Sequence, residues 1–437
     1  MHCALHCSLV TAEMREASRH SVLLWLFCCM VGAFGGVAAA GTVSLSPAAE
    51  VGKVLFFDAR LSASGRISCA TCHDPAYAYG PPNAQAVQPG GVHLTDSGVR
   101  AVPSLRYKQY TPRYEDLRSD PDGSGQPGPG GGFTWDGRAD TLAQQAQIPL
   151  LAANEMANAN PHQVVAKIKS ASYASLFRRA FGNDIFQDET RAFSRALHAL
   201  ESFETEDQSF HPYDSKFDLF RTGQANEMTA SELRGFALFQ DPQRGNCIAC
   251  HISGKARGGA VSPFTDYAYS SIGVPRNSAL PANADPMHFD LGLCQAGNSH
   301  SPESTPQFCG MFKTPTLRNV ALRKVFFHNG GFSSLHDVVE FYNTRDTNPE
   351  RWYPMVGAVV QVFDDLPAIY HANIDQQLPL VHTHGSSPAL SEQDVDDLVS
   401  FLNTLTDGYR SARRPAPPTG VTTPTTGGFE DAAASER

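Results

Sequence analysis

The sequence contains two copies of the motif Cys-x-x-Cys-His, at residues 69–73 and 247–251. Two thiols at this spacing can add to the vinyl groups of a haem, and the adjacent histidine then lies under the iron as an axial ligand. A zinc site needs four nitrogen or sulfur ligands, whereas each motif supplies only three. The motifs therefore predict two covalently bound c-type haems. The residues concerned are Cys69, Cys72 and His73 in the first copy and Cys247, Cys250 and His251 in the second.

The segments that precede the two motifs share a pattern of their own. Gly-x-x-Leu-Phe-x-Asp occupies residues 52–58 and 235–241, and each copy overlaps the end of an amphipathic stretch, at 48–56 and 230–239, that we expect to be helical. Repetition of a whole unit, helix then loop then haem motif, favours two related domains.

Further helices are expected after each motif. Residues 141–203 have helical character, and residues 390–405 carry apolar side chains on one face at helical spacing. Ser391 can cap the second of these stretches, with acidic residues near its positive end. The 36 glycines and 30 prolines indicate many loops, so we expect little sheet beyond short hairpins.

The two ends of the chain differ from the rest. Arg15 and Arg19 precede an apolar run at 22–31, and small residues follow up to Ala40. This order predicts a secretory signal peptide over residues 1–40 and hence a periplasmic protein. The alternative is a membrane anchor, for which the apolar run is short. Residues 411–437 are rich in Pro, Thr, Gly and Ala and are expected to be a disordered tail.

Composition narrows the classes of partner. With a formal net charge of −10, the chain is a poor candidate for binding nucleic acid. Its 41% hydrophobic and 18% charged residues are typical of a globular protein that does not span the membrane once the signal is removed. The length suits two main domains, which we place at residues 41–224 and 225–410.

Two cysteines remain outside the haem motifs and the signal peptide. Cys294 and Cys309 lie close in sequence, within a segment rich in Gly, Ser and Pro. In an oxidising compartment they could pair as a disulfide, and the alternative is two free thiols.

Three segments resemble bacterial diheme cytochrome c peroxidases and MauG-like enzymes. They are residues 61–75 around the first motif, residues 135–156 from Trp-Asp-Gly-Arg-Ala onward, and residues 312–331 with Lys-Thr-Pro-Thr-Leu-Arg-Asn. The resemblance extends over residues 45–408, with the motifs in the expected order. It implies a mainly α fold of two cytochrome c-like domains, each binding one covalent haem, with the domain interface between the haems.

The resemblance implies roles around the first haem. His73 is the proximal ligand, and peroxide binds on the opposite face, in a pocket lined by Gln145, Pro149 and Glu155. Glu155 is the expected general acid/base, since burial raises a carboxyl pKa toward the working pH. Trp135 corresponds to a tryptophan that relays electrons between the haems. From residue type alone, Glu155 would be an ordinary surface carboxylate and Trp135 a core side chain.

The second haem separates the subfamilies. His251 is its proximal ligand, and Tyr342 stands where typical cytochrome c peroxidases carry a methionine ligand and MauG-like enzymes a tyrosine. A phenolate ligand lowers the reduction potential relative to methionine. The alternative is that Tyr342 is a packed ring and that Met355 or Met311 binds the iron.

Two positions complicate this picture. His93 aligns with the loop histidine that closes the first haem in resting cytochrome c peroxidases. If His93 binds the first iron in this way, the second haem must be reduced before the enzyme becomes active. The alternative is a solvated loop histidine. Ala101 stands where the family commonly has an asparagine that helps to hold calcium between the domains. Carbonyl oxygens near Thr314 and Pro315 could still contribute, but one oxygen ligand is lost.

We therefore expect a periplasmic peroxidase that reduces hydrogen peroxide to water with electrons from a small cytochrome c or cupredoxin. One alternative is a MauG-like oxidase that uses peroxide to oxidise side chains of a partner protein. A second is a non-catalytic diheme electron carrier, which would need neither Gln145 nor Glu155. The family also implies a homodimer.

Overall fold

The computed structural model describes residues 44–119, 127–223, 228–254, 261–295, 297, 300–380 and 382–410. The predicted signal peptide and the predicted tail lie outside these residues. The described residues from Leu45 onward form one compact unit. The described α-helices are α1 (Pro47–Phe57), α2 (Cys69–Cys72), α3 (Leu142–Leu151), α4 (Pro161–Ser170), α5 (Ala174–Phe181), α6 (Glu189–Glu206), α7 (Lys216–Arg221), α8 (Ala230–Gln240), α9 (Leu335–Thr344) and α10 (Glu392–Asn403).

The strands are short and pair only in twos within the described part of the chain. All four sheets are antiparallel. In two of them, β3–β4 and β5–β6, the paired strands are separated by more residues than a tight hairpin turn contains. The fold is thus mainly α, as expected. The strands are β1 (Pro89–Gly90), β2 (Asp96–Ser97), β3 (Glu115–Arg118), β4 (Gly128–Gly130), β5 (Tyr269–Ser270), β6 (Phe312–Lys313), β7 (Met355–Val356) and β8 (Val359–Val360). None of the described helices is both long and apolar enough to span a membrane.

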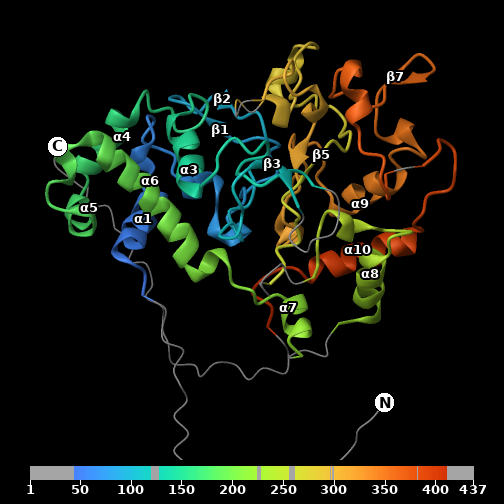
Figure 1. The fold of residues 1–437 in the computed structure, drawn as a ribbon, viewed down its shortest axis with the longest axis horizontal. Coiled ribbons are helices and arrows are strands. Elements are labelled where there is room, and N and C mark those ends of the chain that lie inside the picture. Colours follow the sequence, from blue (N-terminus) through green and yellow to red (C-terminus); the bar gives the residue numbers. More distant parts are fainter. Residues whose placement is uncertain are drawn as a thin grey trace, which may run out of the picture. The chain divides into compact units, whose positions relative to one another are not determined.

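Helix α1 crosses α6 in the first half of the chain (Figure 1). The side chain of Ser46 accepts a hydrogen bond from the Ala49 N–H and so begins α1. At the crossing, a Cβ atom added to Gly52 would lie less than 3.0 Å from the backbone carbonyl of Ala199. The two backbones therefore approach as closely as they do because residue 52 has no side chain.

Helices α8 and α10 repeat this arrangement in the second half (Figure 1). Capping boxes begin both helices, at Thr229 and, as predicted, at Ser391. A Cβ atom at Gly235 would lie less than 3.0 Å from the carbonyl of Asp397. The repeated Gly-x-x-Leu-Phe-x-Asp pattern therefore encodes a close helix crossing that precedes each haem motif.

The buried apolar side chains form two main cores. The first extends from Val51 to Phe210 and the second from Phe217 to Leu405. Edge-to-face aromatic pairs lie at the centre of each, for example Phe56 with Phe203 in the first core. Each core lies beside one of the Cys-x-x-Cys-His motifs, whose Cys69 and Cys247 pack against it.

Buried ion pairs connect the two halves of the sequence. The Arg100 guanidinium contacts Asp136, which is fully buried, at 2.7 Å and Asp290 at 2.6 Å. Arg106 pairs in the same way with Asp407 at 3.0 Å. Removing one partner of such a pair leaves an uncompensated buried charge and costs about 3–5 kcal/mol. These pairs therefore hold the two halves in a defined register.

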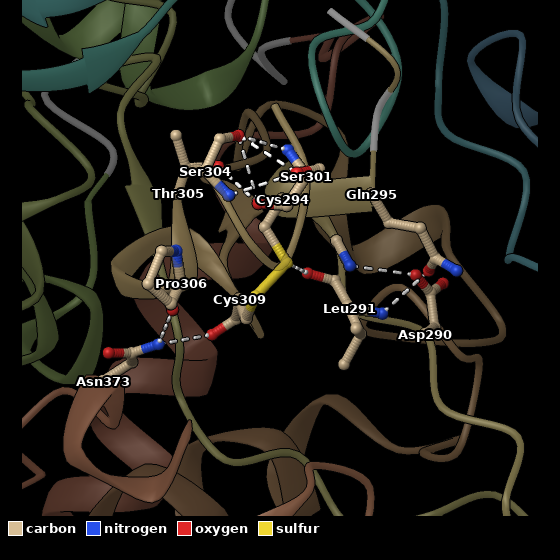
Figure 2. Close-up of a disulfide and its surroundings, with 11 residues drawn as sticks. Asp290, Leu291, Cys294, Gln295, Ser301, Ser304, Thr305, Pro306, Cys309 and Asn373 are labelled. Atoms are coloured by element: carbon tan, nitrogen blue, oxygen red, sulfur yellow. Dashed lines mark hydrogen bonds between the residues drawn. A yellow bond between two sulfur atoms is a disulfide. The ribbon is translucent and has the colours of Figure 1, made fainter. Parts of the chain in front are cut away.

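Cys294 and Cys309 form a disulfide, which confirms that prediction (Figure 2). The Asn373 amide donates hydrogen bonds to the carbonyl oxygens of Pro306, at 2.8 Å, and of Cys309, at 3.0 Å. The bridge thus closes the loop between the two cysteines, and Asn373 attaches the end of that loop to a segment far along the chain.

Candidate active site

The first cavity has a volume of about 440 Å³ and contains the first haem motif in its wall. Ser68 and Thr71 form a capping box that winds residues 69–72 into the single turn α2. This turn brings Cys69 and Cys72 to the cavity together with His73. Both cysteines are free thiols, so they are available for thioether bonds.

His73 is held in the protonation state that an iron ligand requires. Its Nδ1 lies 3.0 Å from the carbonyl oxygen of Tyr79, which can only accept, so Nδ1 carries the proton and Nε2 keeps its lone pair. Burial lowers the pKa of His73 to about 4, which keeps the ring neutral at neutral pH.

Three residues predicted from the resemblance line the same cavity on α3 and the turn after it. They are Gln145, Pro149 and Glu155. Thr141 caps α3, and Pro149, inside the helix, has no N–H to donate to the Gln145 carbonyl. The N–H groups of Glu155 and Met156 bond to the Ala152 and Pro149 carbonyls at 3.0 Å, so the turn is fixed to the helix end.

Glu155 is an exposed residue that lines the cavity, and the protein around the cavity partly shields its carboxyl group from water. Burial raises the pKa of its carboxyl group, and the Arg138 guanidinium opposes the increase. A carboxyl group with a raised pKa exchanges protons at a higher pH than an unperturbed glutamate does.

His93 lies apart from these residues. It is exposed, in the loop between β1 and β2, and it is not among the residues that line either described cavity. The hairpin is nevertheless attached to the turn of Glu155: the Gly91 N–H bonds to the Glu155 carbonyl at 2.8 Å, and the Asn154 amide to the Ser97 carbonyl at 3.1 Å. Displacement of the hairpin would therefore displace Glu155.

The second cavity, of about 230 Å³, contains the second haem motif. Cys247, Cys250 and His251 line it, and neither cysteine is part of a disulfide. The Nδ1 atom of His251 lies 3.1 Å from the Phe264 carbonyl, and burial lowers the pKa of the ring to about 4. The arrangement is the same as at His73, so each cavity offers two thiols and one neutral imidazole and fits a c-type haem.

Tyr342 lines this second cavity from α9. Burial raises the pKa of its phenol. Met355 is 47% exposed on β7, and neither it nor Met311 is among the residues that line the described cavity. Of the three residues considered as the second ligand, the structure brings only Tyr342 to the same space as His251.

Trp135 is one of the residues that line both cavities, and its side chain is only 9% exposed. Its indole N–H donates to the Ala101 carbonyl at 2.7 Å, and its own carbonyl accepts from the Lys313 N–H at 2.8 Å. The predicted relay residue therefore lies in the wall between the two cavities.

Sequence reasoning missed a second repeat that belongs to this wall. Pro-Ser-Leu-Arg at 103–106 and Pro-Thr-Leu-Arg at 315–318 follow the two motifs in turn, and Pro103 and Pro315 both line both cavities. Lys108 and Lys313 also line both cavities, and sequence reasoning assigned neither of them a role. Comparing the two halves residue by residue beyond the haem motifs would have revealed the prolines.

Calcium stays a prediction. Among the described residues no group of three or more His, Cys, Asp or Glu side chains could hold a metal ion. The Ala101 carbonyl already accepts from Trp135, and the Thr314 carbonyl accepts from the Thr265 hydroxyl at 2.7 Å.

A helix-rich chain with two cavities, each lined by a thiol pair and a neutral histidine, is suited to hold two haems. A family model described as di-haem cytochrome c peroxidase matches residues 46–226. The methylamine utilization protein MauG of Paracoccus denitrificans is 33% identical over 386 residues, which cover 85% of this chain and 92% of that protein. The chain belongs to the di-haem cytochrome c peroxidase and MauG family, and it is a haem peroxidase.

Other relatives agree with this assignment. The cytochrome c551 peroxidase of Nitrosomonas europaea is 29% identical over 311 residues, covering 69% of this chain and 74% of that protein. The crystal structure of the diheme peroxidase BthA from Burkholderia thailandensis is 41% identical with a TM-score of 0.74, covering 83% of this chain and 86% of that one. Two haem cofactors follow from the family.

Proposed function

We propose that the protein is a periplasmic diheme c-type peroxidase that reduces hydrogen peroxide to water with electrons from a small cytochrome c or cupredoxin. One observation carries the proposal: Gln145, Glu155 and His73 line a single cavity. A simple electron carrier needs no carboxyl group of raised pKa beside its haem. The haems would occupy domains at residues 41–224 and 225–410.

The reaction converts hydrogen peroxide, two electrons and two protons into two molecules of water. A haem attached at Cys69 and Cys72 supplies the redox chemistry that cleaves the O–O bond. A carboxylate oxygen of Glu155 accepts the proton of the inner peroxide oxygen and returns it to the outer oxygen, which leaves as water. The raised pKa of Glu155 lets the same group accept and donate a proton at a higher pH than an ordinary carboxyl group.

Neighbouring side chains prepare this proton transfer. The Gln145 amide can donate to a peroxide oxygen and accept from its O–H, which orients the substrate. Pro149 has no N–H group, and its ring adds an apolar surface to the cavity wall. Trp135, in the wall common to both cavities, is the proposed path for electrons that arrive at the second haem.

The test is Glu155→Gln, which preserves size but cannot exchange a proton. Both haems should remain attached, with near-normal absorption, while kcat falls by about 10²–10⁴-fold. The matched control is Glu189→Gln, because Glu189 is exposed on α6 and lines neither cavity, so this variant should leave turnover unchanged. Full activity of the Glu155 variant would contradict the assignment.

A MauG-like oxidation of a partner protein is the second candidate. It is favoured by Tyr342 in the second cavity and by the exposed position of His93 outside the first. Rapid mixing of the fully oxidised protein with stoichiometric peroxide distinguishes the two. An immediate response of both haems supports the MauG-like function, whereas a response only after reduction of one haem supports the donor-dependent peroxidase.

A further inference from the structure

The wall between the two cavities carries an unusual amount of positive charge. Five residues line both cavities, and two of them are lysines: Pro103, Lys108, Trp135, Lys313 and Pro315. A third cation, Arg323, lines the second cavity close to the same wall.

Lys313 forms no ion pair with a carboxylate of the described residues. Its ammonium group donates to the Gly132 carbonyl and lies 5.7 Å from the centroid of the Phe133 ring. Asp136 attracts it from a distance, but that carboxylate is already paired with two arginines. The Lys313 side chain is only 9% exposed, and burial lowers its pKa well below the ordinary value. Enclosing a charge among neutral groups is costly unless an anion joins them.

Arg323 and Lys108 are in the same situation. The Arg323 guanidinium donates only to carbonyl oxygens of the described residues, those of Val102 and Val325, each at 3.2 Å. The Lys108 ammonium group forms neither a hydrogen bond nor an ion pair within the described part of the chain. Burial and the nearby Arg323 lower the pKa of Lys108 to about 8.

The acidic side chain that faces Lys108 offsets little of this charge. Glu204, on α6, lines the first cavity and is only 5% exposed, with Oε2 unpaired among the described residues. Burial raises its pKa to about 8, so it is mostly protonated at neutral pH. The three cations around the two haem cavities therefore lack ionised partners among the described residues.

We infer that Lys108, Lys313 and Arg323 bind the propionate carboxylates of the haems, and that Lys108 acts on both haems at once. Each haem carries two such carboxylates, and charge-assisted hydrogen bonds are the strong ones in an enclosed site. The inference rests on the proposal that each cavity holds a haem. Lys108 is a positioning residue, since it acts through the cofactor and not on peroxide.

A shared cation has a measurable consequence. Positive charge near an iron disfavours its oxidised state, so it raises the reduction potential. Because Lys108 borders both cavities, removing its charge should lower the potentials of both haems together. A lysine that served only to pack the wall would not do so.

The experiment compares Lys108→Met with Lys108→Arg and with Lys169→Met in the mature protein. Lys169 is exposed on α4 and lines neither cavity, so it controls for the loss of one charge. Pyridine haemochrome absorbance first counts the haems per chain, and spectroelectrochemistry then gives both midpoint potentials.

We expect two haems per chain in the wild type and a shift of both potentials to lower values in Lys108→Met, with wild-type values in Lys108→Arg and Lys169→Met. Loss of haem from Lys108→Met alone would also support the inference. Unchanged potentials, or a shift of one haem only, would overturn it and leave the peroxidase proposal intact. A wild-type chain without two haems would overturn both.

Discussion

The indole N–H of Trp135 donates a 2.7 Å hydrogen bond to the carbonyl oxygen of Ala101. This bond fixes the ring in the wall that both cavities share. Both groups are buried, so neither can turn to water instead. The position that the family commonly uses for a calcium-binding asparagine thus contributes its backbone to the orientation of the tryptophan.

Replacing Trp135 by Phe removes the indole and this hydrogen bond but keeps an aromatic ring. The unpaired Ala101 carbonyl should cost about 1–3 kcal/mol of the free energy of unfolding. Electron transfer from the second haem to the first should slow, as measured by stopped-flow oxidation of the half-reduced protein with peroxide. Trp352→Phe is the control, because Trp352 lines neither cavity. Equal rates in the two variants would exclude Trp135 as the relay.

The pH dependence of turnover should follow Glu155. The group must be ionised to accept the proton of peroxide, and burial raises its pKa above the ordinary 4.5. Activity should therefore be full above this raised pKa and fall as the pH decreases through it. A profile of kcat/KM against pH should show an acidic limb above pH 4.5, and the limb should disappear in the residual activity of Glu155→Gln. A limb that persists in that variant belongs to another group.

Substitution of Gly52 tests the repeated helix crossing. An added methyl group at Gly52 meets the Ala199 carbonyl, and overpacking of this kind costs about 1–3 kcal/mol. Gly52→Ala should lower the melting temperature of the mature protein, and Gly235→Ala should do the same at the second crossing. In Gly128→Ala the methyl group meets no atom within 4 Å, so the melting temperature should change little. Similar melting temperatures in all three variants would show that the crossings can separate at little cost.

The sequence was sufficient to predict much of the site. Covalent attachment of haem requires the residues within each Cys-x-x-Cys-His motif to be close in the sequence, so the two motifs were recognisable without coordinates. Helices α8 and α10 were recognisable from their helical periodicity. The pairing of Cys294 with Cys309 was one of two possibilities for the cysteines left over, and the structure decides it against two free thiols. Lys108 could not be predicted, because its importance comes from the lack of an ionised partner in the described structure, and partners are a property of the fold.

The position of His93 in space could not be predicted from the sequence either. Its alignment with a closing histidine is a matter of sequence, whereas its separation from the cavity depends on the β1–β2 hairpin and on the bond from Gly91 to the Glu155 carbonyl. Although Gly91 and His93 are close neighbours in the sequence, the first is buried against the turn of Glu155 and the second is exposed to solvent.

Tyr342→Phe tests the ligand of the second haem. Loss of the phenol oxygen should change the absorption spectrum and spin state of that haem and leave the first haem unaltered, because Tyr342 lines only the second cavity among those described. Tyr353→Phe is a matched control: the Tyr353 hydroxyl bonds to the Gly273 carbonyl, and the residue lines neither cavity. An unchanged spectrum in Tyr342→Phe would exclude the phenol as a ligand and would weaken the MauG-like candidate function. A changed spectrum in Tyr342→Phe alone would assign the second axial position to α9.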